Sequence, residues 1–239
     1  MPVYSLPGFF EPVSALTHLV GAAAFAVLAV VLIRRGCGDT ARVALLGVFA
    51  TSSVLLLSVS AACHMLPEGS GGRHVLGRLD GAAIFVLIAG THTAVHGLFF
   101  RGFARWGAVI LMWAITAAAI SVFAVFSGGL PGVVVTAVYL ALGWTAGVSG
   151  IVIWRRFGTA RIVLPLLGGA AYSAGAVLLA LRWPTLIPGV IGPHEVWHFA
   201  VLAGLLLHWS FLFRNARLAS QAPRALHASG RASAPLAAA

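Results

Sequence analysis

The chain has 239 residues, of which 60% are apolar and only 8% are charged. Soluble globular proteins carry roughly a quarter charged residues, so this composition excludes an ordinary soluble domain and favours a protein dissolved in lipid. The net charge is +10, and all fifteen basic residues are arginine. These arginines lie between long apolar runs instead of forming one basic patch, so we expect no nucleic-acid partner.

Seven stretches are long and apolar enough to cross a bilayer, which takes about 20 residues. They run over residues 13–33, 43–66, 76–99, 106–126, 133–154, 162–181 and 194–213. The breaks between them carry Arg, Gly or Pro, and their shortness predicts antiparallel neighbouring helices. The predicted fold is an all-α, polytopic seven-transmembrane-helix bundle over residues 1–213. Residues 214–239 are rich in Arg, Ala, Ser and Pro, which predicts a disordered tail.

Arginine placement predicts the orientation of this bundle, because basic residues collect in cytoplasmic loops. With seven spans, the N-terminal side of the membrane receives only Arg73, Arg78 and Arg182. The other side receives Arg34, Arg35, Arg42, Arg101, Arg105, Arg155, Arg156, Arg161 and the four arginines of the tail. We therefore expect an integral protein of the plasma or inner membrane, with the C-terminus in the cytoplasm and the N-terminus outside.

Histidines occupy the ends of two spans. His194 and His198 lie four residues apart at the start of the last span, so they share one helix face and can bind one metal ion. A pair of interfacial histidines is the alternative interpretation. His64 lies near the end of the second span, one turn after Ser60. Considered alone, this serine and histidine are typical of a back-bonded helix residue and a satisfied core group.

The up-and-down topology gives these residues a shared position. It places the end of the second span and the starts of the first, third and seventh spans at the same face of the membrane. Ionisable groups at membrane depth are costly and are usually functional. The residues expected at this depth are Glu11, His18, His64, Asp80, His194 and His198.

Five other histidines are not expected to bind the same metal. His92 and His96 lie 12 and 16 residues beyond the aspartate of the third span, about 18–24 Å away along a helix. His208 lies ten residues beyond the second histidine of the last span, about 15 Å deeper. The excluded residues are His74, His92, His96, His208 and His227.

Three neutral imidazoles with a fourth position open to water describe a catalytic zinc site rather than a closed structural one. Imidazole suits zinc best, although copper, iron and nickel also accept it. Zinc lowers the pKa of bound water toward about 7. We expect Asp80 to hydrogen-bond that water and accept its proton. We expect Ser60 to orient Asp80 or His64, or to stabilise an oxyanion.

Four motifs resemble the haemolysin III family, which belongs with the progestin and adipoQ receptors. They are Glu11 to Gly21 (EPVSALTHLVG), Ser60-x-x-x-His64, Leu79-Asp80 with Ile84 to Thr91, and His194-Glu195-Val196-Trp197-His198. The resemblance covers nearly the whole seven-span region. It implies zinc on His64, His194 and His198, with Asp80 contacting the zinc through water and Ser60 one turn before the first ligand.

The wider superfamily includes alkaline ceramidases, which hydrolyse lipid amides. The resemblance therefore implies a zinc-dependent hydrolase of lipid amides or esters in membrane lipid homeostasis, with membrane lipid as its partner. One alternative is a receptor or regulator of membrane state with structural zinc. Another is a pore-forming cytolysin, which ranks last because few charges lie mid-span to line a pore.

The chain also departs from the family it resembles. It has Ser14, Gly81 and His92-Thr93-Ala94 where relatives often carry other residues. These changes concern the substrate and remove no expected ligand. The adiponectin receptors keep their N-terminus in the cytoplasm, opposite to the orientation that the arginines predict here. Gly and Ala in the spans permit close helix packing within one bundle or between chains, so the oligomeric state stays open.

Overall fold

The computed structural model describes residues 4–126 and 131–217, and its regular structure there is helical. In this part of the chain seven spans are long and apolar enough to cross a membrane. They are α1 (Pro12–Arg35), α2 (Thr40–Met65), α3 (Gly71–Phe99), α4 (Phe103–Phe126), α5 with α6 (Gly132–Trp144 and Ala146–Phe157), α7 (Val163–Ala180) and α8 (Pro193–Asn215). The predicted seven-helix membrane bundle is confirmed. The predicted tail lies outside the described residues from position 218 onward.

The fifth span, expected as one continuous helix, divides into α5 and α6 at Thr145. The Thr145 side-chain hydroxyl oxygen lies 2.6 Å from the Leu142 carbonyl oxygen. Irregular backbone at membrane depth is tolerated where it faces protein or a cavity rather than lipid. The short 3-10 helix η1 (Thr159–Arg161) then leads into α7.

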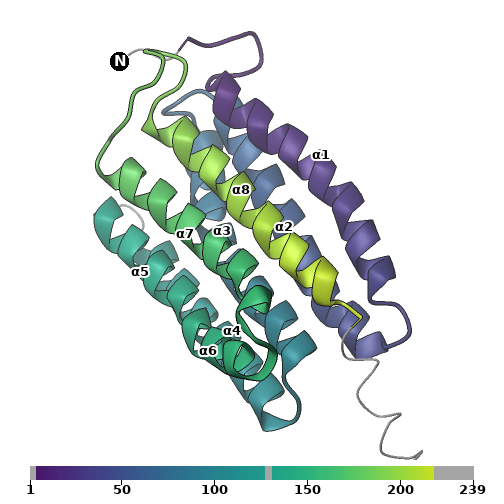
Figure 1. The fold of residues 1–239 in the computed structure, drawn as a ribbon. Helices are drawn as coiled ribbons and strands as arrows, with labels where there is room; N and C mark the ends of the chain where they lie inside the picture. Colours follow the sequence, from purple (N-terminus) through teal and green to yellow (C-terminus); the bar gives the residue numbers. More distant parts are fainter. Residues whose placement is uncertain (1–3, 127–130, 218–239) are drawn as a thin grey trace, which may run out of the picture.

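The helices form two groups, and α3 and α8 contact members of both (Figure 1). Helices α1, α2, α3 and α8 surround the main apolar core, and α4 packs on the outer side of α3. Helices α5, α6 and α7 complete the bundle, with α7 packed along α8. Helix α4 exposes Ile110, Leu111 and Val125, as a helix does when its outer face meets lipid.

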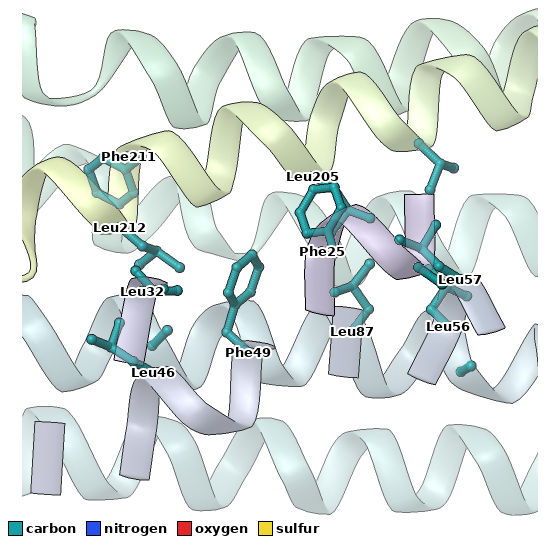
Figure 2. Close-up of a cluster of buried hydrophobic side chains, with 14 of the residues drawn as sticks. Phe25, Leu32, Leu46, Phe49, Leu56, Leu57, Leu87, Leu205, Phe211 and Leu212 are labelled. Carbon is teal, nitrogen blue, oxygen red and sulfur yellow. The ribbon is translucent and has the colours of Figure 1, made fainter. Parts of the chain in front are cut away.

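The core is a continuous stack of leucine and phenylalanine side chains (Figure 2). Phe49, Leu57 and Leu205 are among those with no exposed surface. Lipid tails are as apolar as leucine, so close packing, rather than escape from water, is what this cluster contributes to stability. The tightly filled core fixes the relative positions of α1, α2, α3 and α8, and hence of the polar groups at their ends.

The segment before α1 ties several chain ends together. Tyr4 N–H donates to the Gly189 carbonyl, in the loop that precedes α8, at 3.0 Å. Glu11 N–H donates to the His64 carbonyl, near the end of α2, at 3.0 Å. The starts of α1 and α8 therefore lie at one end of the bundle with the end of α2, at the upper end of Figure 1.

Candidate metal centre

Three histidine side chains converge at this end of the bundle. His194 Nε2 lies 3.3 Å from His64 Nε2 and 3.1 Å from His198 Nε2. The three candidate ligand atoms lie within 4.8 Å of one another. His64 and His198 are buried, and His194 is half-buried. Three nitrogens from two helices thus face one point.

Helix geometry explains this convergence. His64 is the second-last residue of α2, and His194 is the second residue of α8. His198 follows His194 by about one turn, so the two rings project from the same face of α8. Because the end of α2 lies beside the start of α8, the single ring from α2 meets the pair from α8.

Glu11, the N-cap residue of α1, contacts both His64 and Arg73. Its carboxylate accepts a hydrogen bond from His64 Nδ1 and lies 2.8 Å from Arg73 Nη2. A carboxylate on one imidazole nitrogen holds the proton there and leaves the other nitrogen as a lone-pair donor. Burial disfavours the charge on Glu11, but the hydrogen bonds from His64 and Arg73 prevail and lower the pKa of its carboxyl to about 2.

Arg73 connects this carboxylate to the end of α2. Its Nη1 donates to the Cys63 carbonyl at 2.6 Å, one residue before His64. The α3 N-cap residue, Ser70, accepts a hydrogen bond from the Arg73 N–H at 3.2 Å, which fixes the first turn of α3. The ends of α1, α2 and α3 are thereby fastened around His64.

A second carboxylate positions α8. Glu195 Oε2 accepts from the Gly192 N–H at 2.8 Å and caps the start of this helix. Its Oε1 accepts from the Ser14 hydroxyl of α1, also at 2.8 Å. One helix turn further, His18 of α1 stacks on His198, with ring centroids 3.8 Å apart. These contacts fix where the α8 histidines stand relative to α1.

The expected catalytic pair lies beside the histidines. Ser60 is buried on α2, and its hydroxyl lies beside the half-buried Asp80 carboxylate of α3. Asp80 lies near His64 at the end of α2. Asp80 does not belong to the close group of ligand atoms. Tyr139 of α5 donates to the carbonyl oxygen of Gly81, the residue after Asp80, at 2.8 Å.

The structure therefore brings together the three histidines expected as ligands and places Ser60 with Asp80 next to them. Histidines 74, 92, 96 and 208, which were expected to lie elsewhere, are absent from the group among the residues described. The sequence places Glu11 and His18 at this depth and suggests no role for either. Arg73 precedes the third apolar span predicted to begin at residue 76, whereas α3 begins at Gly71.

Comparison with known proteins agrees with this architecture. A family model described as haemolysin-III related matches residues 9–209, which is most of the chain. The chain belongs to this family. It is 27% identical over 196 residues to the hemolysin-3 homolog of Bacillus subtilis (strain 168), covering 81% of this chain and 88% of that protein. It is 28% identical over 196 residues to hemolysin-3 of Bacillus cereus, covering 81% of this chain and 86% of that one.

The donor set in this haemolysin-III-related chain fits a metal ion. Three imidazoles are a ligand set found in zinc enzymes, and the carboxylate on His64 Nδ1 is the usual outer partner of a metal-binding histidine. His64 Nε2, freed by that partner, faces two further Nε2 atoms. The three histidines could therefore hold a cation at their centre.

We predict that Glu11→Ala weakens metal binding by about ten- to a hundred-fold, because His64 loses the partner that orients its ring and fixes its proton on Nδ1. Competition with a chelator of known affinity measures the change in purified protein. Glu68→Ala, which removes an exposed carboxylate just beyond α2, is the matched control and should leave affinity unchanged. Equal affinity in the Glu11 variant and the native protein would contradict a role for Glu11 in the metal centre.

Proposed function

We propose that this protein is a zinc-dependent hydrolase that cleaves amide or ester bonds of membrane lipids. The observation that carries the proposal is the convergence of three imidazole Nε2 atoms near a carboxylate that lies beside a serine hydroxyl. The membership in the haemolysin-III-related family and the seven membrane spans support a lipid as the substrate class.

Six polar residues of the centre have defined tasks under this proposal. His64, His194 and His198 hold zinc, which supplies Lewis acidity toward a carbonyl and makes water more acidic when it is bound. Asp80 accepts a proton from the attacking water and returns it to the leaving group. Ser60 orients the Asp80 carboxylate, and Glu11 orients His64.

A pore-forming role receives less support from the packing. The centre of the bundle between α1, α2, α3 and α8 is filled by apolar side chains (Figure 2). A water-filled channel through one copy would need polar groups along its length. A regulator with structural zinc remains the second candidate, because the same three histidines could serve it.

The orientation predicted from the arginines is part of the proposal. We propose that the metal centre faces the outside of the cell and that the arginine-rich ends of the helices face the cytoplasm. The confirmed number of spans supports this view, since it puts the arginines of the described residues at the same ends of the helices as the sequence does.

Metal analysis tests the ligands. We expect about one zinc per chain in purified protein by plasma mass spectrometry, and its loss when His64, His194 and His198 are all replaced by alanine. A second triple alanine variant, at His92, His96 and His208, is the matched control and should retain the metal. Full zinc retention in the first variant, with the fold intact by circular dichroism, would refute the assignment of these ligands.

Asp80→Asn separates chemistry from metal binding. The amide cannot accept the proton, so we expect hydrolysis of a ceramide or other lipid amide to fall by about a hundred-fold or more while zinc content stays the same. Asp39→Asn, at the opposite end of the bundle, is the control. Mass spectrometry of lipids in proteoliposomes measures the products. A variant as active as the native enzyme would exclude Asp80, and zinc-loaded native protein without activity on any amide or ester would favour the regulator.

Cys37 reports the orientation. It is exposed in the turn after α1, whereas Cys63 is buried, so Cys37 is the accessible thiol of the described region. We expect an impermeant maleimide to leave it unmodified in intact cells and to label it after permeabilisation. Cys37→Ser should abolish that signal. Labelling of intact cells would place the arginine-rich side outside and reverse the orientation.

A further inference from the structure

A cavity of about 450 Å³ lies between α3, α5, α6, α7 and α8, a volume within the range that binds small ligands. Its walls are mainly leucine, isoleucine, valine and aromatic side chains. Along α3 it reaches from Ile84 to His96, which corresponds to about 18 Å of helix. The cavity is therefore long, and apolar side chains line most of its length.

The far end of this cavity, away from the metal centre, carries three other histidines: His92, His96 and His208. None of them has a task in the proposed hydrolase. They come from α3 and α8, the same helices that carry Asp80 and the metal-binding pair at the opposite end. The polar residues of these two helices thus form two separate clusters.

His92 and His96 both direct Nδ1 at a backbone carbonyl oxygen. Their Nδ1 atoms lie 2.9 Å from the Ile88 carbonyl and 3.0 Å from the Ala104 carbonyl. A carbonyl only accepts, so Nδ1 carries the proton and Nε2 of the neutral ring is an acceptor. The hydroxyl oxygens of Thr145 and Ser149 lie 3.0 Å and 2.8 Å from these Nε2 atoms.

His208 also directs Nδ1 at a backbone carbonyl oxygen, but its Nε2 is a free acceptor. Its Nδ1 lies 2.8 Å from the Gly204 carbonyl, and its ring stacks on Tyr172 with centroids 5.5 Å apart. Gly168 leaves the space for this ring, because a Cβ there would come within 2.5 Å of it. Within the described residues, Nε2 of His208 has no hydrogen-bond partner, and the side chain lines the cavity.

The walls also exclude a charged ligand and leave room for a chain. Of the described residues, no Arg, Lys, Asp or Glu lines the cavity, so nothing there compensates a charged head group. Gly143, Gly147 and Gly150 form a bare strip along α5 and α6, and a Cβ at each would meet no atom within 4 Å. The cavity accepts a hydrocarbon chain along its length and a hydrogen-bond donor at its histidine end.

We propose that this cavity binds a single-chain lipid with an uncharged hydroxyl head group, placed head-first at His92, His96 and His208. The hydroxyl donates to His208 Nε2, and the chain lies along Ile84 and Leu87 toward the metal side. The site is independent of the hydrolase proposal, because it uses other residues and needs no metal.

Photolabelling in nanodiscs tests this site. The probe is a dodecanol derivative that carries a diazirine near its hydroxyl, and peptide mass spectrometry locates the attachment. We expect labels on α6 and α8 near Ser149 and His208. Unlabelled dodecanol should compete better than dodecyl methyl ether, which has no donor. His208→Phe should weaken competition by dodecanol about five-fold, the effect of one hydrogen bond, and leave competition by the ether unchanged.

Two further variants keep the test independent of folding and of the metal. Gly147→Leu should fill the cavity and remove labelling, while Gly47→Leu on α2, where an added Cβ also meets nothing within 4 Å, should not. Alanine at His64, His194 and His198 should leave labelling unchanged. The proposal fails if alcohol and ether compete equally, if labels map to the metal-side ends of α2 and α8, or if Gly147→Leu still labels.

Discussion

The carboxylate of Glu11 holds together the end of the bundle on which the candidate metal centre depends. Its side chain bonds His64 and Arg73, while its own N–H bonds the His64 carbonyl. A charge at this depth is stable only with such partners, because isolated ions are poorly tolerated away from water. The same contacts that satisfy the charge therefore position the His64 ring of the candidate metal centre and close α1 onto α2.

The sequence could predict how deep in the membrane each residue of this site lies along its helix. The order of the spans and a rise of 1.5 Å per residue are enough to place His64 beside His194 and His198 and to separate His92 from them. The structure agrees, because the apolar core keeps the helices in register over their whole length.

Contacts that depend on loops and on helix starts could not be predicted in the same way. The bond from Glu11 to His64 requires the segment before α1 to fold back on the end of α2. Arg73 reaches Glu11 only because α3 begins five residues before the apolar run does. The division at Thr145 lies inside an apolar run without proline, where hydropathy gives no signal. Glu195 is the intermediate case, since its place at a helix start suggested a cap, but its bond to Ser14 depends on tertiary packing.

The two histidine clusters favour ligands of different charge. At the metal side the Nε2 atoms converge on one another, which suits a cation and leaves little room for a neutral donor. At the far side two of the Nε2 atoms are already paired with hydroxyls and one faces the cavity, which suits a neutral donor and not a cation. An apolar cavity runs between these levels, with Trp197 of α8 in its wall one residue before His198. A lipid chain lying there would extend toward the three converging histidines from a head group in the other half of the membrane, so the length of the chain would decide how closely it approaches Asp80 and these histidines.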